Sequence, residues 1–308
     1  MIDWPVKGLA HDLDGATARS QGLVDTEFLQ RPDSSGRSQK RGEVVLDQFR
    51  WRDLDNSADS LRETAELRYM AYCVERSFLD STQYPDGIEW DEFDARAFHV
   101  GIFHGSTGLM TATARIVGAD DEGLLPLHQH CVVDGKYQAF LQDVHNVGEI
   151  SRFVMSRAAL DGICASAQGP DGGSKPVSKQ ELCLPAILTL YKSIYQTARR
   201  NGIPVLVAAM EQTLRRLVNR FHFPFRQIGP EVDYFGPVAP FMLDLDELDD
   251  VLFDEAPWLL AEFYRGLDGK QLQTVWDVGL NDKVASFSPE TTREQSDAAV
   301  AAYEDAAA

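Results

Sequence analysis

An amphipathic helix followed at once by an apolar strand lies near the middle of this sequence. Over residues 184–200 apolar side chains recur at three- and four-residue spacing, and Pro185 is expected at the first helical position. Residues 204–208 are apolar without interruption, which is typical of a strand buried on both faces. A helix joined directly to a buried strand predicts an α/β (α+β) fold with a mixed central sheet flanked by helices.

Helix and strand patterns continue on both sides of this unit. The spacing of apolar residues predicts helices over 57–78 and 211–221, an antiparallel hairpin from strands 97–103 and 109–117, and strands over 147–155, 224–228 and 238–245. A stretch rich in Gly, Pro and Ser predicts a long loop over 168–178. Polar ends complete the pattern, so we expect one folded domain over 43–280 between flexible segments at 1–42 and 281–308.

Composition excludes several classes of function. The net charge of -19 opposes binding to nucleic acid or to anionic lipid, because such a surface repels polyanions. No uninterrupted apolar run is longer than six residues, far short of the roughly 20 that cross a bilayer, so we expect no membrane span. The first residues lack the apolar stretch of a signal peptide, and we therefore expect a cytoplasmic protein.

The cysteine and histidine patterns predict no metal site. The four cysteines lie far apart without a CxxC pair, which favours reduced, buried thiols over disulfides or zinc binding. His128 and His130 are two residues apart with no second ligand cluster, which is weak evidence for a metal. The sequence also contains no Walker A pattern and no Gly-x-Ser-x-Gly nucleophile elbow.

Residues 89–94, Glu-Trp-Asp-Glu-Phe-Asp, place four carboxylates around two aromatic residues. A solvated acidic loop is one interpretation. The aromatic neighbours favour another, in which the carboxylates are partly buried and need cationic partners to stay ionised. The candidate partners are Arg68, Arg115 and Arg152.

Charged residues also interrupt the strand predicted over 147–155. Alternation on a strand predicts that Glu149, Ser151 and Phe153 share one face while Ile150 and Arg152 share the other. A charge in a central strand has either a structural partner or a function. In the functional interpretation Glu149 is a general base and Arg152 anchors a substrate.

One basic segment contrasts with the acidic chain. Residues 178–230 contain eight Lys or Arg against two Glu, whereas the parts before and after this segment are acidic. The two helices predicted there would expose arginines opposite their apolar stripes, so an acidic partner could dock on this segment. A solvated helix face is the alternative.

The order of these motifs resembles a known group of enzymes. Arg68-Tyr69, Glu89-x-Asp91-x-Phe93-Asp94, Ala114-Arg-Ile-Val117, Leu125-Pro-Leu127 and Glu149-Ile-Ser-Arg-Phe153 are similar to motifs of the autoinducer (acyl-homoserine-lactone) synthases and N-acyl amino acid synthases. These are variants of the GNAT acyltransferase fold. The motifs Ala209-Met-Glu211, Leu214-x-Arg216, Ile228-Gly-Pro230 and Tyr234-x-Gly-x-x-Ala-Pro240 look closest to the PEP-CTERM/exosortase system-associated acyltransferases, and the resemblance covers about 45–245.

This resemblance implies an enzyme that moves a fatty acyl chain from the phosphopantetheine thioester of acyl carrier protein to the amine of an amino acid or related small molecule. It implies no tightly bound cofactor, and the acyl chain would occupy an apolar slot between the sheet and the helix at 184–200. The coenzyme A loop of the fold, [RQ]-x-x-G-x-[GA], is incomplete at Arg115-x-x-Gly118-x-Asp120 and at Arg226-x-x-Gly229-x-Glu231, which disfavours simple acetyl coenzyme A use.

The resemblance and the charge pattern together assign three groups of site residues. The expected catalytic residues are Glu149 and Ser151. The expected substrate-binding residues are Arg68, Tyr72, Glu89, Asp91, Asp94, Arg115 and Arg152, and the expected carrier-docking residues are Lys192, Arg199, Arg200, Arg215, Arg216 and Arg220.

Two other functions stay open on the sequence. One is an acyl-homoserine-lactone synthase, although the tryptophan that autoinducer synthases place soon after the first helix is replaced here by Phe78 and Tyr84. The other is a non-catalytic module with the same fold that senses a lipid or an amino acid. A full set of charged site residues counts against a degenerate site.

Overall fold

The computed structural model describes residues 48–54, 58–143, 146–166, 179–234 and 236–267. The segments predicted to be flexible at 1–42 and 281–308, and the loop expected at 168–178, lie outside these residues. The described strands are β1 (Phe49–Leu54), β2 (Ala97–His104), β3 (Met110–Gly118), β4 (Val147–Met155), β5 (Val205–Met210), β6 (Arg226–Gln227), β7 (Val232–Asp233) and β8 (Pro237–Asp244). The α-helices are α2 (Ala58–Tyr69), α3 (Gly135–Asp143), α4 (Arg157–Ser166), α5 (Lys179–Arg200), α6 (Gln212–Arg220), α7 (Leu245–Glu255) and α8 (Pro257–Tyr264).

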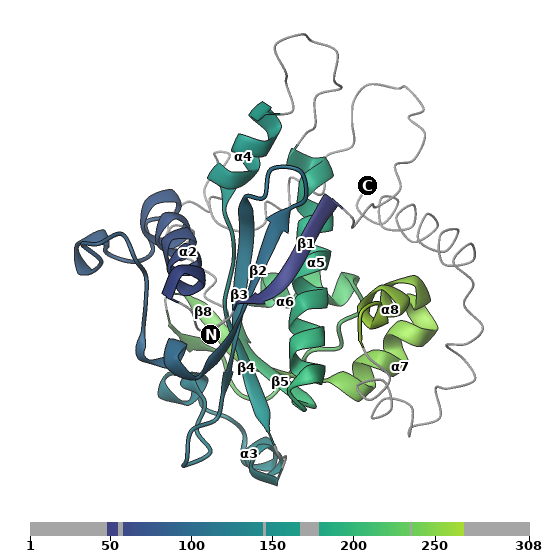
Figure 1. Cartoon of the computed structure of the whole chain (residues 1–308). Helices are drawn as coiled ribbons and strands as arrows, with labels where there is room; N and C mark the ends of the chain where they lie inside the picture. The colour runs from purple at the N-terminus through teal and green to yellow at the C-terminus, as the bar shows by residue number, and fades with distance from the viewer. Residues whose placement is uncertain (1–47, 55–57, 144–145, 167–178, 235, 268–308) are drawn as a thin grey trace, which may run out of the picture.

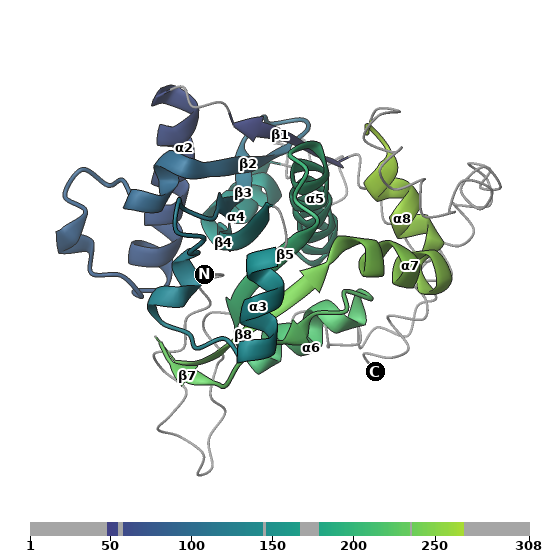
Figure 2. The same cartoon turned by 90° about the horizontal axis from the view of Figure 1, so that it is seen from below.

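These strands form a mixed sheet, as the sequence predicts. Its order is β1-β2-β3-β4-β5-β8-β6, with β7 paired to β8. Among the described strands every pairing is antiparallel except that between β4 and β5, which is parallel. The two views show α2 on one side of the sheet and α5 on the other, with α6, α7 and α8 beside the second half (Figures 1 and 2).

The apolar core is divided between the two faces of the sheet. The larger part lies under α5, where Ile187, Leu190 and Ile194 pack on strand residues such as Ile102 and Ile116. Smaller clusters lie on the opposite face, one of them under α2. Since both faces are covered, the strands are apolar almost throughout, and a polar residue inside them needs a specific partner.

Two helices differ from their predicted course. α5 begins at Lys179 instead of Leu184, so Pro185 lies inside the helix. Pro185 has no N–H group, so the helix loses one backbone hydrogen bond there. Burial of Leu182 and Cys183 in the core offsets this loss and stabilises the helical turn that precedes the proline.

The helix predicted over 57–78 changes form after Tyr69. Residues 70–75 form a π-helical turn, which adds a residue to the turn and rotates the side chains beyond it. The apolar spacing that predicts the helix over 57–78 places Val74 on its inward face, but Val74 is 52% exposed, whereas Ala71 and Tyr72 are buried. The hairpin and the strand over 147–155 lie where predicted, but the strand expected over 224–228 shortens to Arg226–Gln227.

Candidate functional site

The sheet opens between its two parallel strands. β4 and β5 pair only over Val147–Glu149 and Val205–Val207, although β4 continues to Met155 and β5 to Met210. Beyond Glu149 the two strands are not paired with each other, which leaves an opening in the sheet with backbone groups along its edges. We call this opening the fork.

A β-bulge lies beside the fork. Thr113 pairs with Val154 and Arg115 with Ser151, so Arg152 and Phe153 together oppose the single residue between Thr113 and Arg115. Arg152 has φ 50°, a left-handed conformation that is rare for a residue with a side chain. Bulges of this kind re-aim side chains and are common next to active sites.

The bulge corrects the predicted alternation along β4. Phe153 does not share a face with Glu149 and Ser151; it lines the same apolar pocket as Ile150. Arg152, expected on the face of Ile150, instead binds carboxylates that Arg68 and Arg115 also bind. A strict two-residue period fails here because the extra residue shifts every later side chain to the other face.

The three arginines and three of the four carboxylates form one buried network, as the sequence predicts. Arg68 donates to Glu89 and, in a forked pair of 2.7 and 3.0 Å, to Asp94. Arg115 binds Asp91 through a second fork of 2.6 and 2.8 Å. Arg152 donates to Glu89 at 3.0 Å and to Asp91 at 2.8 Å. Glu92, the fourth carboxylate, is exposed.

A short turn presents two of these carboxylates together. In the 3-10 turn Glu92–Arg96, Asp91 caps the turn by accepting from the Phe93 amide, while Asp94 accepts from the Asp91 amide. These backbone hydrogen bonds hold both carboxylates in place independently of the arginines. His99 lies beneath them, with Nε2 3.1 Å from the Asp94 carbonyl oxygen, a contact that the sequence did not predict.

The network keeps its carboxylates ionised. Burial alone would raise the pKa of Glu89, but the charges of Arg152 and Arg68 outweigh it and hold that pKa below its ordinary value. Burial likewise opposes ionisation of Asp94, but the hydrogen bonds and charge of Arg68 overcome it, so that the pKa of Asp94 lies well below its usual range.

Burial also separates the roles expected of the arginines. Arg68 is fully buried and all three of its side-chain nitrogens donate to Glu89 or Asp94, so the expectation that Arg68 binds the substrate is wrong. Arg115 is 2% exposed, whereas the side chains of Arg152 and Asp91 are 13% and 23% exposed. Tyr72 is buried, with its ring 5.9 Å from the Arg152 guanidinium.

The two expected catalytic residues lie at the start of the fork. Glu149 is the last residue of β4 that pairs with β5, and its buried Oε2 accepts a 2.6 Å hydrogen bond from the Leu127 amide. Ser151 is buried, and its hydroxyl accepts a 2.9 Å bond from Arg115 Nε. The geometry therefore makes Ser151 an orienting partner of Arg115, and the catalytic roles of both residues remain predictions.

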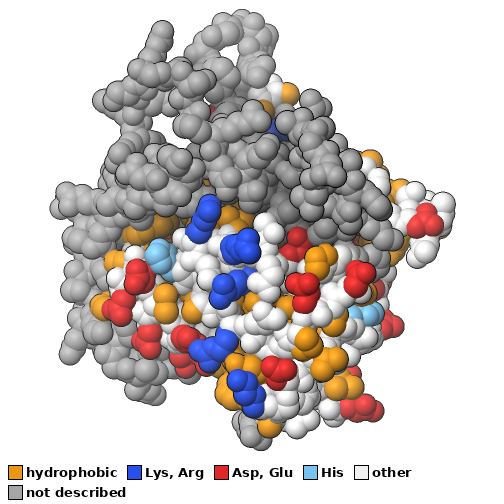
Figure 3. Space-filling view, turned by 180° about the vertical axis from the view of Figure 1, so that it is seen from behind, with side chains coloured by type: hydrophobic (Ala, Val, Ile, Leu, Met, Phe, Trp, Pro, Cys, Tyr) orange, Lys and Arg blue, Asp and Glu red, His pale blue; other side chains and the backbone are white. Residues whose placement is uncertain are grey.

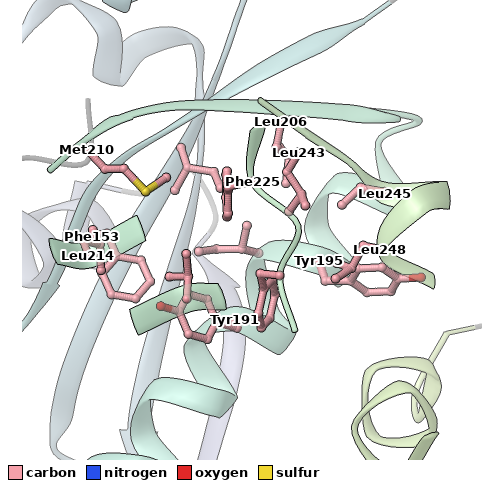
Figure 4. Close-up of a pocket in the computed structure, with 14 residues that line it drawn as sticks. Phe153, Tyr191, Tyr195, Leu206, Met210, Leu214, Phe225, Leu243, Leu245 and Leu248 are labelled. Carbon is pink, nitrogen blue, oxygen red and sulfur yellow. The ribbon is translucent and has the colours of Figure 1, made fainter. Parts of the chain in front are cut away.

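An apolar pocket adjoins the fork on the α5 face of the sheet (Figure 4). The space among its lining side chains is about 470 Å³ when the solvent at its opening is counted with it. Its lining comes from β4, α5, β5, α6, the segment between α6 and β6, β8 and α7, and consists of Ile150, Phe153, Tyr191, Ile194, Tyr195, Leu206, Met210, Leu214, Val218, Phe223, Phe225, Leu243, Leu245 and Leu248. No charged side chain lines it. The sequence predicted a slot beside the helix at 184–200, but it could not predict the lining contributed by α6 and α7.

Half of the expected carrier-docking residues are engaged within the protein. Arg199 is 7% exposed and binds Asp246 and Asp249 at 2.7 and 2.6 Å. Lys192 binds Glu262 at 3.1 Å and Arg200 binds Asp53 at 3.3 Å. The expectation of a free surface at these three residues is therefore wrong, because carboxylates distant in the sequence neutralise them.

The other half lies on α6. Arg216 and Arg220 are exposed and Arg215 is half-buried, while Leu214, Leu217 and Val218 pack inward. Within the described residues none of these three arginines forms an ion pair. α6 lies on the same face of the sheet as α5, toward the rear of the view in Figure 1, and the view from behind shows several Lys and Arg side chains near one another on that surface (Figures 2 and 3).

Glu211 is a second unusual carboxylate. It directly follows Met210 at the end of β5, is 6% exposed, and its Oε1 has no hydrogen-bond partner among the described residues. Burial raises its pKa to about 7. Its position directly after an apolar strand was visible in the sequence, but its burial was not.

We expect Glu211→Gln to stabilise the protein at high pH. The folded state keeps a proton on Glu211 that the unfolded chain releases near pH 4.5, so its contribution to the free energy of unfolding falls between pH 4.5 and 7. The variant should gain about 2–3 kcal/mol relative to wild type between pH 5 and 8. Urea unfolding of both proteins at the two pH values measures this gain, and equal differences at both would contradict a buried, titrating Glu211.

The described part of the chain contains no group of three or more His, Cys, Asp or Glu placed to hold a metal ion. None of its helices is both long and apolar enough to span a membrane.

Comparison with known proteins identifies a domain at this site. Residues 67–162 match the family described as Acetyltransferase (GNAT) domain, a range that includes the ion network, the bulge and Glu149. The predicted relationship to GNAT acyltransferases is thereby confirmed at the level of this domain. No curated protein sequence matches the chain.

Several solved structures are similar in fold. An N-acyl amino acid synthase from uncultured soil microbes, FeeM, has 17% identity and a TM-score of 0.42, covering 66% of this chain and 94% of its own. The acyl-homoserine-lactone synthase LasI has 17% identity and a TM-score of 0.41, covering 64% and 89%. The coenzyme A-dependent acyl-homoserine lactone synthase BjaI has 17% identity and a TM-score of 0.44, covering 67% and 87%.

Proposed function

We propose that this chain, an acyltransferase with a GNAT domain over residues 67–162, transfers a fatty acyl group from the phosphopantetheine thioester of an acyl carrier protein to the amine of an amino acid or related small molecule. The observation that carries this proposal is the apolar pocket beside the fork. An acetyl group needs no such space, whereas a fatty chain must be removed from water over its whole length.

The fork joins two different environments. On one face Ile150 and Phe153 of β4 open into the apolar pocket. On the other, Glu149 packs against the segment at Leu127, and the ion network lies close by through Ser151 and Arg115. A thioester held in the fork would place its acyl chain in the pocket and its carbonyl next to the polar side.

The proposed reaction forms a C–N bond and breaks the thioester C–S bond. The attacking amine must be neutral and loses a proton as the amide forms, while the phosphopantetheine sulfur leaves as a thiol. Glu149 would take that proton, directly or through one water, and then return it to the leaving sulfur, so that the sulfur departs as the thiol and the carboxylate is regenerated. Backbone N–H groups along the unpaired edges of β4 and β5 would stabilise the oxyanion of the tetrahedral intermediate.

The polar face suits a charged acceptor. Asp91 and Arg152 are the members of the network that reach the surface, and they would contact the amine and the carboxylate of an amino acid. Arg68 and Arg115 lie behind them and hold the carboxylates in place. Because Arg152 reaches the surface and Arg68 does not, we expect Arg152 to bind the substrate carboxylate.

The exposed arginines of α6 suit an acidic carrier protein. The chain is strongly acidic overall, so a free basic surface stands out from its surroundings. α6 also supplies Leu214 and Val218 to the pocket, and a carrier bound to its outer face would stand beside the acyl slot.

Reversing two of these charges tests the docking surface. The double variant Arg216→Glu, Arg220→Glu should raise KM for the acyl carrier protein about tenfold at low salt, because electrostatic steering is lost, and leave kcat unchanged. The effect should shrink at high salt. Turnover of an acyl-pantetheine donor, which has no carrier protein, serves as the control; an equal loss with that donor would contradict the docking role.

Product analysis tests the proposed function itself. The purified protein is incubated with a mixture of acyl carrier proteins bearing different acyl chains and with amino acids, and in parallel with acyl-coenzyme A donors. Mass spectrometry should detect N-acyl amino acids with the carrier-bound donor. An acyl-homoserine lactone formed only with S-adenosylmethionine would assign the other synthase activity, and no acylated product from any donor would favour a binding module.

A further inference from the structure

The acyl pocket has two distinct ends. In Figure 4, Phe153, Met210 and Leu214 lie at the end next to the fork, and Tyr195, Leu245 and Leu248 lie together at the opposite end. Tyr191 and Phe225 lie between the two groups. The lining of the pocket therefore extends from the fork to α7.

The first turn of α7 closes the far end. Leu245 and Leu248 are 0% and 1% exposed, so their side chains are held entirely inside the protein. α7 follows β8 without a loop, and Asp244 caps it by accepting from the Asp246 and Glu247 amides. The two leucines are thus presented from a helix with a fixed start.

Polar contacts from α5 fix α7 at this position. The ring of Tyr195 lines the pocket while its hydroxyl donates to Asp249 Oδ1 at 2.8 Å. Arg199 binds the other oxygen of Asp249 at 2.6 Å, and Asp249 is 1% exposed. Two other residues of α5 contact α8: Lys192 binds Glu262 at 3.1 Å, and Gln196 donates to the Phe263 carbonyl at 2.6 Å.

These contacts give two basic residues of α5 a structural role in place of the carrier-docking role expected from the sequence. Lys192 and Arg199 face α8 and α7, and their partners come from residues 246–262, which lie beyond the 67–162 range of the matched domain. The far end of the pocket therefore lies outside that range, as does the rest of its lining except Ile150 and Phe153.

We propose that Leu248, together with Leu245 and the ring of Tyr195, stops the acyl chain and sets the longest chain that the enzyme accepts. The inference rests on the proposed function, since it names the substrate length for the same slot. A wall tied by several hydrogen bonds cannot retreat easily, because packed interiors yield little to added volume. Chains gain affinity with each methylene, about fourfold, until the terminal methyl group reaches this wall, and lose it beyond.

A binding series tests this without requiring turnover. Even-numbered saturated fatty acids of increasing length displace a fluorescent fatty acid from the wild-type protein and its variants. Leu248→Phe should move the longest tolerated chain to a shorter one, and Leu248→Ala should move it to a longer one. Leu214→Phe, a substitution of the same kind at the fork end, should weaken the binding of chains of every length to the same extent.

The outcomes separate the length stop from the proposed function. If the wild-type protein prefers one chain length and neither Leu248 variant changes that length, the proposal that Leu248 limits chain length is wrong, but the proposal that the pocket binds the acyl chain is kept. If wild type binds no fatty acid of any length, the acyl pocket and the length stop both fall. Leu248→Val, which removes a single methylene, replaces Leu248→Ala if the latter does not fold, and its smaller shift toward longer chains is then the expected result.

Discussion

Replacing Arg68 by methionine is expected to lower the free energy of unfolding by about 3–5 kcal/mol at pH 7, because it removes the fully buried cation that Glu89 and Asp94 share and leaves each of them with one arginine, Arg152 or Arg115. Methionine fills similar space, so the loss reports charge more than volume. This is a large fraction of the stability of a typical domain, and it should also reduce the yield of folded protein. Urea unfolding measures the loss.

The loss should depend on pH. In wild type the pKa values of Glu89 and Asp94 lie below their ordinary values, so their ion pairs stabilise the fold fully above about pH 4.5 and cease to do so as pH falls through the lower folded-state pKa values. The difference between wild type and variant should therefore shrink below about pH 4.5.

Arg62→Met provides the matched control. Arg62 lies on the same helix and forms an i,i+4 pair with Glu66, but both side chains are about half exposed or more. Its loss should stay below about 0.5 kcal/mol. A loss at Arg68 no larger than that at Arg62 would show that the network contributes nothing to folding.

The sequence predicted which residues form this ion network but not how completely they are buried. Aromatic residues between the acids of 89–94 indicated partial burial, and Arg68, Arg115 and Arg152 were the available cations. The fold brings all three to the same carboxylates. That Arg68 is fully enclosed, and so unable to bind substrate, depends on tertiary packing that no local pattern encodes.

Two features could not be predicted from local patterns, for physical reasons. The bulge at Arg152 adds one residue to a strand, and hydrophobic alternation alone does not locate such an insertion. The net charge of the basic segment 178–230 includes only the residues of that segment. Its Lys192 and Arg199 are neutralised by Asp246, Asp249 and Glu262, which come later in the chain. A charge count by segment describes a surface only when the partners are local.

Glu149→Gln is expected to lower kcat/KM for acyl transfer by about 10²–10⁴, the range for loss of a general base. The substitution removes one ionisable group and keeps nearly the same shape. The glutamine carbonyl can still accept the bond that the Leu127 amide donates to Oε2, so the segment at the fork should keep its position. Binding of the acyl carrier protein should change little, since its expected surface is on α6.

Two comparisons separate a base from a structural carboxylate. Glu122→Gln makes the same change at an exposed residue five positions before Leu127 and should leave turnover unchanged. The wild-type rate should fall with acid as the base is protonated, whereas the residual rate of Glu149→Gln should lose that dependence. If the variant were slow but kept the wild-type pH profile, Glu149 would position the fork and another group would take the proton. With unchanged turnover, Glu149 would have no part in the chemistry at the fork.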